Sequence, residues 1–127
     1  MPAPFPPIEP DPPDVAFPDP GLANEHGVVA VGDDLRPSTL LLAYRSGIFP
    51  WPHKRILPWF SPDPRAVFPL EAPPTWSRSL RRTLRNHGFT ITLDAAFRDV
   101  MRACGEVRDK KTWISDEMIE AYGELHD

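Results

Sequence analysis

Hydrophobic side chains recur three or four residues apart in several stretches of this chain, a spacing that predicts amphipathic helices. The first predicted helix begins at Pro37, because proline suits the first helical position, where its missing N–H would have no partner. Leu40, Leu41 and Tyr44 share one face of this helix. Gly47 can adopt the left-handed conformation that closes a helix, so we expect the helix to end there.

A second helix is predicted over residues 78–87. Ser77 is a suitable N-cap, because its hydroxyl can accept a hydrogen bond from the first turn, and Gly88 is a suitable residue after the C-terminal end. Leu80 and Leu84 lie four residues apart on one face. We therefore expect both leucines to face inward.

Two further helical stripes follow, one after Asp94 and one after Ser115, and each of these residues is a suitable N-cap. Gly105 should stop the earlier helix, and a charged loop over residues 106–111 should follow it. The stripes consist of Phe97, Val100, Met101 and Cys104, and of Met118, Ile119, Tyr122 and Leu125. The later stripe has no partner further along the chain and reaches Asp127 with no stop signal, which predicts a fold that continues past this residue.

Short runs rich in β-branched and aromatic residues predict strands at residues 28–31, 66–68 and 89–93. The first run lies between glycines and should be followed by a turn through residues 33–34. Residues 48–65 combine aromatic side chains with five prolines. Because proline lacks an N–H donor and fixes φ, we expect this span to be stiff and extended, without ladder hydrogen bonds. The aromatic side chains that it displays are Phe49, Trp51, Trp59 and Phe60.

Composition narrows the class of protein. Nine of the 18 prolines lie in the first 20 residues, which predicts an arm outside the core from Met1 to Pro20. The single cysteine excludes an internal disulfide, and no apolar run is long enough to span a bilayer or to form a signal peptide. These features predict a soluble cytoplasmic protein. Cys104 lies on an apolar stripe, so we interpret it as a small buried hydrophobic residue.

The chain offers few candidates for metal or cofactor chemistry. Its four histidines show no ligand spacing with one another or with Cys104, so we expect no metal site. No glycine-rich phosphate loop follows a predicted strand, so we expect no nucleotide cofactor.

The net charge of −4 by itself argues against a nucleic-acid-binding protein, but the charges are unevenly distributed. Residues 1–34 hold seven acids and no Lys or Arg, residues 35–111 hold all 14 basic residues, and residues 112–127 hold five acids. One face of the predicted helix 78–87 carries Arg78, Arg81, Arg82 and Arg85. On the sequence alone a solvated face is the favoured interpretation, and phosphate binding by the guanidinium groups is the alternative.

The order of several motifs resembles that of the leucyl/phenylalanyl-tRNA–protein transferases. At the centre, Gly47-Ile-Phe-Pro-Trp51 is followed by Trp59-Phe-Ser-Pro-Asp-Pro-Arg65. Further motifs in the same order are Gly27 to Leu35, Trp76-Ser-Arg-Ser-Leu80, Thr112-Trp-Ile114 and Ala121-Tyr-Gly-Glu-Leu-His126. The resemblance covers all but about the first 15 residues. Each motif is weak by itself, but together they are highly specific.

The resemblance implies an aminoacyltransferase that moves Leu or Phe, with Met a further candidate, from aminoacyl-tRNA to the N-terminal Arg or Lys of a protein, which marks that protein for N-end-rule degradation. The implied partners are Leu-tRNA, Phe-tRNA and such acceptor proteins, with no cofactor, no membrane and no DNA, and we expect a monomer. The implied fold is α+β. The Pro-rich arm (1–20) precedes a small N-terminal α/β domain (21–64), and residues 65–127 begin an acetyltransferase-like (GNAT-like) domain that is incomplete in this chain.

The resemblance also assigns site residues. The phosphates of the tRNA acceptor end should be bound by Arg78, Arg82 and Arg85. The aminoacyl-adenosine should be bound by Trp51, Trp113, Tyr44 and Tyr122, because flat rings stack on unpaired bases. Without the resemblance, burial in the core is the favoured interpretation of such aromatic residues. We expect Trp59 and Trp76 to be packing residues, and the catalytic groups to lie beyond Asp127.

Two functions of different classes remain open at this point. The chain could be the tRNA-end-binding portion of an active transferase. It could also be a catalytically silent RNA-binding or interaction module that derives from that family. An assay of aminoacyl transfer separates them.

Overall fold

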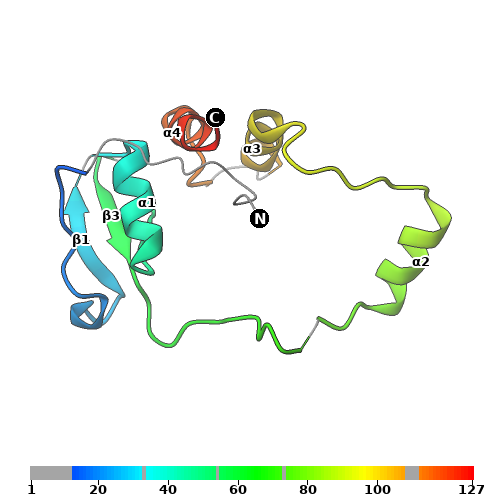
Figure 1. Ribbon diagram of the computed structural model, residues 1–127, viewed down its shortest axis with the longest axis horizontal. Coiled ribbons are helices and arrows are strands. Elements are labelled where there is room, and N and C mark those ends of the chain that lie inside the picture. Colours follow the sequence, from blue (N-terminus) through cyan, green and yellow to red (C-terminus); the bar gives the residue numbers. More distant parts are fainter. Residues whose placement is uncertain (1–12, 33, 54, 73, 108–111) are drawn as a thin grey trace, which may run out of the picture. The chain divides into compact units, whose positions relative to one another are not determined.

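The computed structural model describes residues 13–32, 34–53, 55–72, 74–107 and 112–127, and it combines helices with a small antiparallel sheet (Figure 1). This mixture confirms the α+β class. The chain divides into two compact units, one formed by Met1–Asp63 with Phe97–Asp127 and the other by Pro64–Ala96. Among the described residues, no helix is long and apolar enough to cross a membrane.

The first unit contains most of the regular structure. Its elements are the 3-10 helix η1 (Pro20–Leu22), strands β1 (Val28–Gly32), β2 (Phe49–Pro50) and β3 (Leu57–Phe60), and helices α1 (Pro37–Arg45), α3 (Phe97–Glu106) and α4 (Asp116–His126). The predictions of β1, α1 and α4 are confirmed, with Pro37 in the first turn of α1, Gly47 at φ 74° and the Ser115 hydroxyl capping α4. Residue 33, in the predicted turn, lies outside the described residues.

The sheet has the order β1-β3-β2, with both pairs antiparallel. The expectation that the proline-rich span makes no ladder is therefore wrong. Two of its prolines lie in strands: the carbonyl of Pro58 in β3 accepts the Trp51 N–H at 3.0 Å, and Pro50 lies in β2, which is paired on one side only. The register between β1 and β3 shifts between Val28 and Ala30, as at a β-bulge, and the two strands stay paired on both sides of the shift.

The hydrophobic core of the first unit lies between the sheet, α1 and α4. Leu40, Ile48 and Met118 are fully buried, and Trp59 is only 2% exposed, which confirms Trp59 as a packing residue. The apolar stripe of α4 needs a packing partner, and it packs against α1 and α3. The earlier helices of the chain supply that partner.

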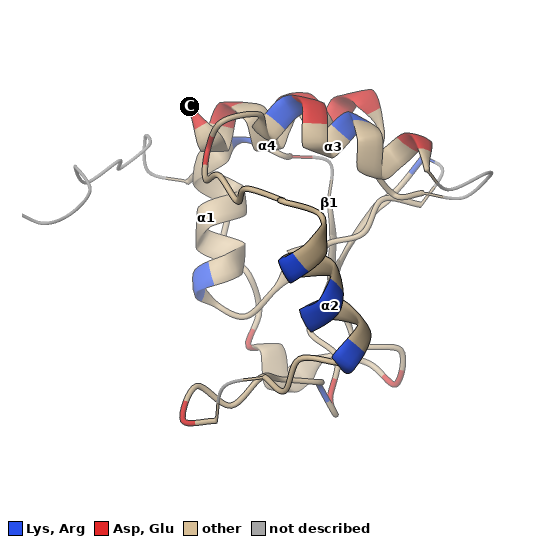
Figure 2. Cartoon of the chain, turned by 90° about the vertical axis from the view of Figure 1, so that its right-hand side faces the viewer, with Lys and Arg blue, Asp and Glu red and all other residues tan. Residues whose placement is uncertain are grey.

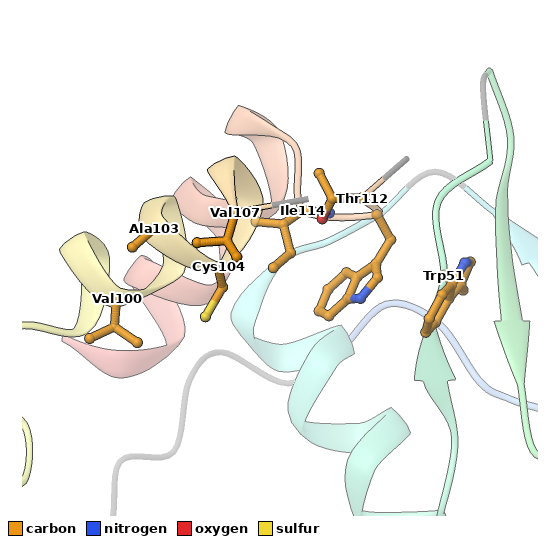
Figure 3. Close-up of a pocket in the computed structure, with 8 residues that line it drawn as sticks. Trp51, Val100, Ala103, Cys104, Val107, Thr112 and Ile114 are labelled. Carbon is orange, nitrogen blue, oxygen red and sulfur yellow. The ribbon is translucent and has the colours of Figure 1, made fainter. Parts of the chain in front are cut away.

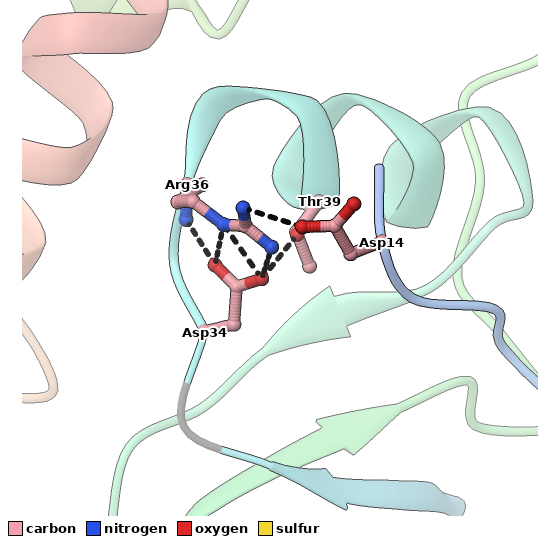
Figure 4. A network of polar contacts seen from close by, with 4 residues as sticks. All are labelled: Asp14, Asp34, Arg36 and Thr39. Carbon is pink, nitrogen blue, oxygen red and sulfur yellow. Dashed lines mark hydrogen bonds and ion pairs between the residues drawn. The ribbon is translucent and has the colours of Figure 1, made fainter. Parts of the chain in front are cut away.

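A network of polar side chains joins the described part of the N-terminal arm to the start of α1 (Figure 4). The Asp34 carboxylate accepts hydrogen bonds from the Arg36 backbone N–H, the Arg36 guanidinium and the Thr39 hydroxyl, and Arg36 also pairs with Asp14 at 3.0 Å. The hydrogen bond from the Arg36 guanidinium is the main reason that the pKa of Asp34 falls to about 2. Phe17 packs edge-on against Trp59, with ring centroids 4.8 Å apart. Residues 1–12 of the predicted arm lie outside the described residues.

Helix α3 differs from its prediction at both ends. Asp94 is not its N-cap, because the helix begins three residues later and Asp94 has a φ of 54°, outside the extended range of N-cap residues. Gly105 does not end the helix, which continues to Glu106. Cys104 is exposed, so the prediction that it is buried is wrong. Of the predicted charged loop, residues 108–111 lie outside the described residues.

The second unit contains helix α2 (Arg78–Asn86), whose ends are as predicted. The Ser77 hydroxyl accepts the Leu80 N–H at 3.1 Å, and Gly88 has a φ of 59°. However, Leu80 and Leu84 are 38% and 43% exposed, because α2 buries none of its residues. The inward orientation predicted for these leucines is therefore wrong.

The strands predicted at residues 66–68 and 89–93 are also wrong. A strand needs a neighbouring strand for its backbone hydrogen bonds, and the described residues of this unit form none. The apolar side chains of both segments stay exposed, as Phe68 at 82% and Ile91 at 81% illustrate. Trp76, predicted to be a packing residue, is 56% exposed.

Candidate functional site

The four aromatic residues expected at an adenosine site lie together in the first unit. The Trp51 and Trp113 ring centroids are 5.6 Å apart with the rings tilted by 34°. Trp113 meets Tyr122 edge-on at 6.3 Å, and Tyr122 meets Tyr44 edge-on at 6.2 Å. Residues from the end of β2, from α1, and from α4 and the segment before it therefore form one continuous aromatic cluster, which we call the aromatic site.

The backbone around each indole of the aromatic site is held locally. Trp51 directly follows β2, and its N–H donates to the Pro58 carbonyl of the central strand. Trp113 lies in a turn just before α4. The Ile114 N–H donates to the Thr112 hydroxyl at 3.0 Å and so closes this turn. Trp51 is 47% exposed, so one of the two rings keeps a large surface for a ligand.

The two tyrosines form the end of the aromatic site opposite Trp51 in the chain of ring contacts. Their hydroxyl oxygens are 2.5 Å apart, which joins α1 to α4 by a short hydrogen bond. Burial raises the pKa of Tyr122 well above its usual range, and the hydrogen bond to Tyr44 raises it further. The Tyr122 hydroxyl therefore stays neutral across the physiological pH range and serves as a hydrogen-bonding group.

An open and mostly apolar cavity of about 610 Å³ lies beside the two indoles (Figure 3). Trp51 and residues 112–114 form one part of its lining, and α3 supplies the other. These side chains are Val100, Ala103 and Cys104 of α3 and Val107, which directly follows α3. The lining role of α3 was not predicted from the sequence, because the apolar stripe of this helix was expected to face the core. The same stripe was the signal that could have located the cavity wall.

The arginines predicted to bind phosphate lie in the second unit, on α2, which carries no acidic side chain (Figure 2). Arg78, Arg81, Arg82 and Arg85, together with Ser79, line an open surface hollow of about 410 Å³, and we call the four arginines the arginine row. Within the described part of the chain, Arg78, Arg82 and Arg85 make no side-chain hydrogen bond or ion pair. Arg81 differs, because its guanidinium donates two hydrogen bonds to the Trp76 carbonyl, at 3.0 and 3.2 Å.

The arrangement is suited to binding rather than to bond making. Stacking surfaces and unpaired guanidinium groups are the two kinds of contact that unpaired nucleic acid uses, for its bases and its phosphates respectively. Among the described residues, no three His, Cys, Asp or Glu side chains lie close enough together to hold a metal ion.

Comparisons with known proteins identify the family. The family model described as "Leucyl/phenylalanyl-tRNA protein transferase N-terminal domain" matches residues 33–63, and the one described as "Leucyl/phenylalanyl-tRNA protein transferase" matches residues 67–127. Together the two matches cover most of the chain, and they meet near the end of the proline-rich span.

Three curated relatives carry the name leucyl/phenylalanyl-tRNA–protein transferase. The one from Yersinia enterocolitica is 52% identical over 87% of this chain and 48% of its own length. Those from Syntrophobacter fumaroxidans and Thiobacillus denitrificans are 51% and 48% identical over 89% and 97% of this chain, and over 50% of their own lengths. The chain spans about half the length of the curated relatives it matches. It belongs to the leucyl/phenylalanyl-tRNA–protein transferase family.

Proposed function

We propose that this chain is the tRNA-end-binding portion of an aminoacyltransferase that moves Leu or Phe from aminoacyl-tRNA to the N-terminal Arg or Lys of a protein in the cytoplasm, marking that protein for N-end-rule degradation. The aromatic site binds the 3′-terminal adenosine of the tRNA, and Arg78, Arg82 and Arg85 bind its phosphates. Residues 65–127 begin a GNAT-like domain in this proposal, which follows the N-terminal domain at residues 21–64.

The observation that carries the proposal is the continuous contact of Trp51, Trp113, Tyr122 and Tyr44. These residues come from parts of the sequence as far as 78 positions apart, and ring contacts and a hydroxyl pair join them. A cluster that served only the core would be sealed, whereas Trp51 and Tyr44 are each 47% exposed. Large flat rings that are half open to solvent are suited to stacking on a base.

The reaction of the family sets what the chain must supply. The α-amine of the acceptor protein attacks the ester carbonyl that joins the amino acid to the tRNA ribose, the new C–N bond forms, and the ribose oxygen leaves with the deacylated tRNA. An enzyme for this step must position the ester, remove a proton from the amine and stabilise the oxyanion. The aromatic site and the arginine row serve the first task.

The activity itself is tested by transfer of labelled Phe from Phe-tRNA to a protein whose first residue is Arg. We expect transfer when this chain is joined to the remaining half of the Yersinia relative, and little or none from the 127 residues alone. The Yersinia enzyme at full length is the positive control. Binding of Phe-tRNA without transfer by the joined protein would favour the alternative, a catalytically silent RNA-binding module.

The adenosine site is tested separately with a non-hydrolysable aminoacyl-adenosine analogue. Trp51→Ala should weaken its binding by about 1–3 kcal/mol, because the stacked ring is lost, and Trp51→Phe should retain part of the affinity. Ile56→Ala is the matched control, since Ile56 is 53% exposed in the same unit and lies outside the aromatic site. Equal binding by Trp51→Ala and the unchanged protein, measured by calorimetry, would remove Trp51 from the site.

A further inference from the structure

The residue directly before the N-cap of α2 is an exposed tryptophan, Trp76, and one member of the arginine row, Arg81, holds its backbone. Trp76 is 56% exposed, and its carbonyl accepts both the Nε and the Nη2 hydrogens of Arg81. No ring contact joins Trp76 to another aromatic side chain of the described residues. An indole that packs against no other ring, in a unit whose described residues are all at least partly exposed, is free to meet a ligand.

Arg81 has a different role from its neighbours in the arginine row. Its backbone N–H donates to the Ser77 carbonyl as part of the helix, while its guanidinium turns back to the residue before the cap. Because the guanidinium group is planar, two of its N–H groups that donate to one carbonyl fix both the direction and the distance of that carbonyl. Arg81 therefore holds the chain at the entrance of α2, and its guanidinium is already occupied.

The other members of the arginine row remain available. Arg78, Arg82 and Arg85 line the same open hollow as Arg81, and α2 has no acid in its first turn to neutralise them. Proteins that bind single-stranded nucleic acid combine such cationic grooves with aromatic rings on which bases stack. Trp76 and the arginine row supply both parts within one short segment.

We propose that Trp76 is a stacking platform for an unpaired RNA base, and that Arg81 is the positioning residue that holds it beside the phosphates bound by Arg78, Arg82 and Arg85. This inference rests on the proposed function, because it requires that α2 meets the unpaired end of an RNA. It adds a second place of stacking, in a different unit from the aromatic site, and it separates Arg81 from the phosphate-binding arginines.

The stacking role is tested with two probes, a single-stranded RNA of ten nucleotides and a blunt RNA duplex of the same length. Trp76→Leu keeps an apolar side chain but removes the ring, so it should weaken binding of the single strand roughly 5- to 150-fold and binding of the duplex less than twofold. Trp76→Phe should recover part of the lost affinity, which a merely structural role for the indole would not require. Equal affinity of Trp76→Leu and the unchanged protein for the single strand would overturn the inference.

The positioning role is tested by the salt dependence of single-strand binding. Arg82→Ala and Arg85→Ala should each reduce the slope of log K against log salt by about 0.7, because each removes one phosphate contact. Arg81→Ala should reduce it by less than half as much, yet weaken single-strand binding more than duplex binding. Arg81→Lys keeps the charge but lacks the two-donor fork, so it should show the same loss. A slope change for Arg81→Ala as large as that for Arg82→Ala would overturn the positioning role.

The phosphate site and the stacking platform fail in different ways. If the slopes for Arg82→Ala and Arg85→Ala stay unchanged, α2 does not bind phosphate, and the proposed function of the arginine row falls together with this inference. If those slopes change and Trp76→Leu has no effect, the phosphate site stands and the stacking platform falls alone.

Discussion

The two units of the chain are held together by different kinds of interaction. The first is organised around side chains that are fully removed from water, among them Leu40, Ile48 and Met118, which come from segments far apart in the sequence. In the second unit α2 buries no residue, and its helix is defined by a capping serine, a left-handed glycine and the hydrogen bonds from Arg81. Long-range packing fixes the aromatic site, whereas local hydrogen bonds fix the arginine row.

The contrast between the packed first unit and the locally held second unit is tested most strongly by replacing one leucine in each unit with alanine. Leu40→Ala should lower the free energy of unfolding by about 2–5 kcal/mol, because Leu40 is fully buried and the change leaves a cavity. Leu84→Ala should lower it by less than about 1 kcal/mol, since Leu84 is 43% exposed. Urea denaturation followed by tryptophan fluorescence measures both, and similar losses would mean that α2 contributes to the same core.

A pair of capping serines gives a smaller but more specific contrast. Ser115→Ala removes the cap of α4, which packs in the core, so it should lower the free energy of global unfolding by about 1 kcal/mol. Ser77→Ala removes the equivalent cap of α2 and should speed hydrogen exchange of the α2 amides while leaving the urea midpoint almost unchanged. A shift of the midpoint by Ser77→Ala as large as that by Ser115→Ala would contradict the separation of the two units.

The smallest expected effect concerns pH and only the first unit. The folded-state pKa of Asp34, about 2, lies below its ordinary value of 3.8, so its stabilising contribution is complete above about pH 4 and is lost as the pH falls toward 2. We expect this contribution to stay below about 1 kcal/mol, because the Arg36 side chain is 53% exposed and solvent screens the pair. The difference in unfolding free energy between the unchanged protein and Asp34→Asn should therefore shrink between pH 5 and pH 2. A constant difference would show that the ionised carboxylate is not the stabilising form.

The sequence predicted those elements whose signals are local. Pro37, Ser77 and Ser115 mark helix starts, and Gly47 and Gly88 mark helix ends, because each acts on hydrogen bonds within one turn. The errors concern features that depend on a partner elsewhere. Phe89 to Leu93 has the alternation of a strand but no neighbouring strand, whereas Leu57 to Phe60 contains a proline and yet forms the central strand between two neighbours.

The candidate site likewise contains residues that the sequence predicted and residues that it did not. The family resemblance selected Trp51, Trp113, Tyr44 and Tyr122, and their contacts in the structure support that choice, although their role stays a prediction. The cavity wall on α3 was not predicted, since periodicity shows that Val100 and Cys104 share a face but not what that face meets. The occupied guanidinium of Arg81 was equally hidden, because four arginines at helical spacing are indistinguishable until their partners are known.

Pro50 in the outer strand of the sheet has a consequence for how the protein behaves in a crowded solution. Although β2 is an outer strand, Pro50 is buried and its nitrogen carries no hydrogen, so at this position a foreign strand would find neither an open edge nor a donor. The sheet therefore resists growth by addition of a second molecule at the point where Trp51 begins.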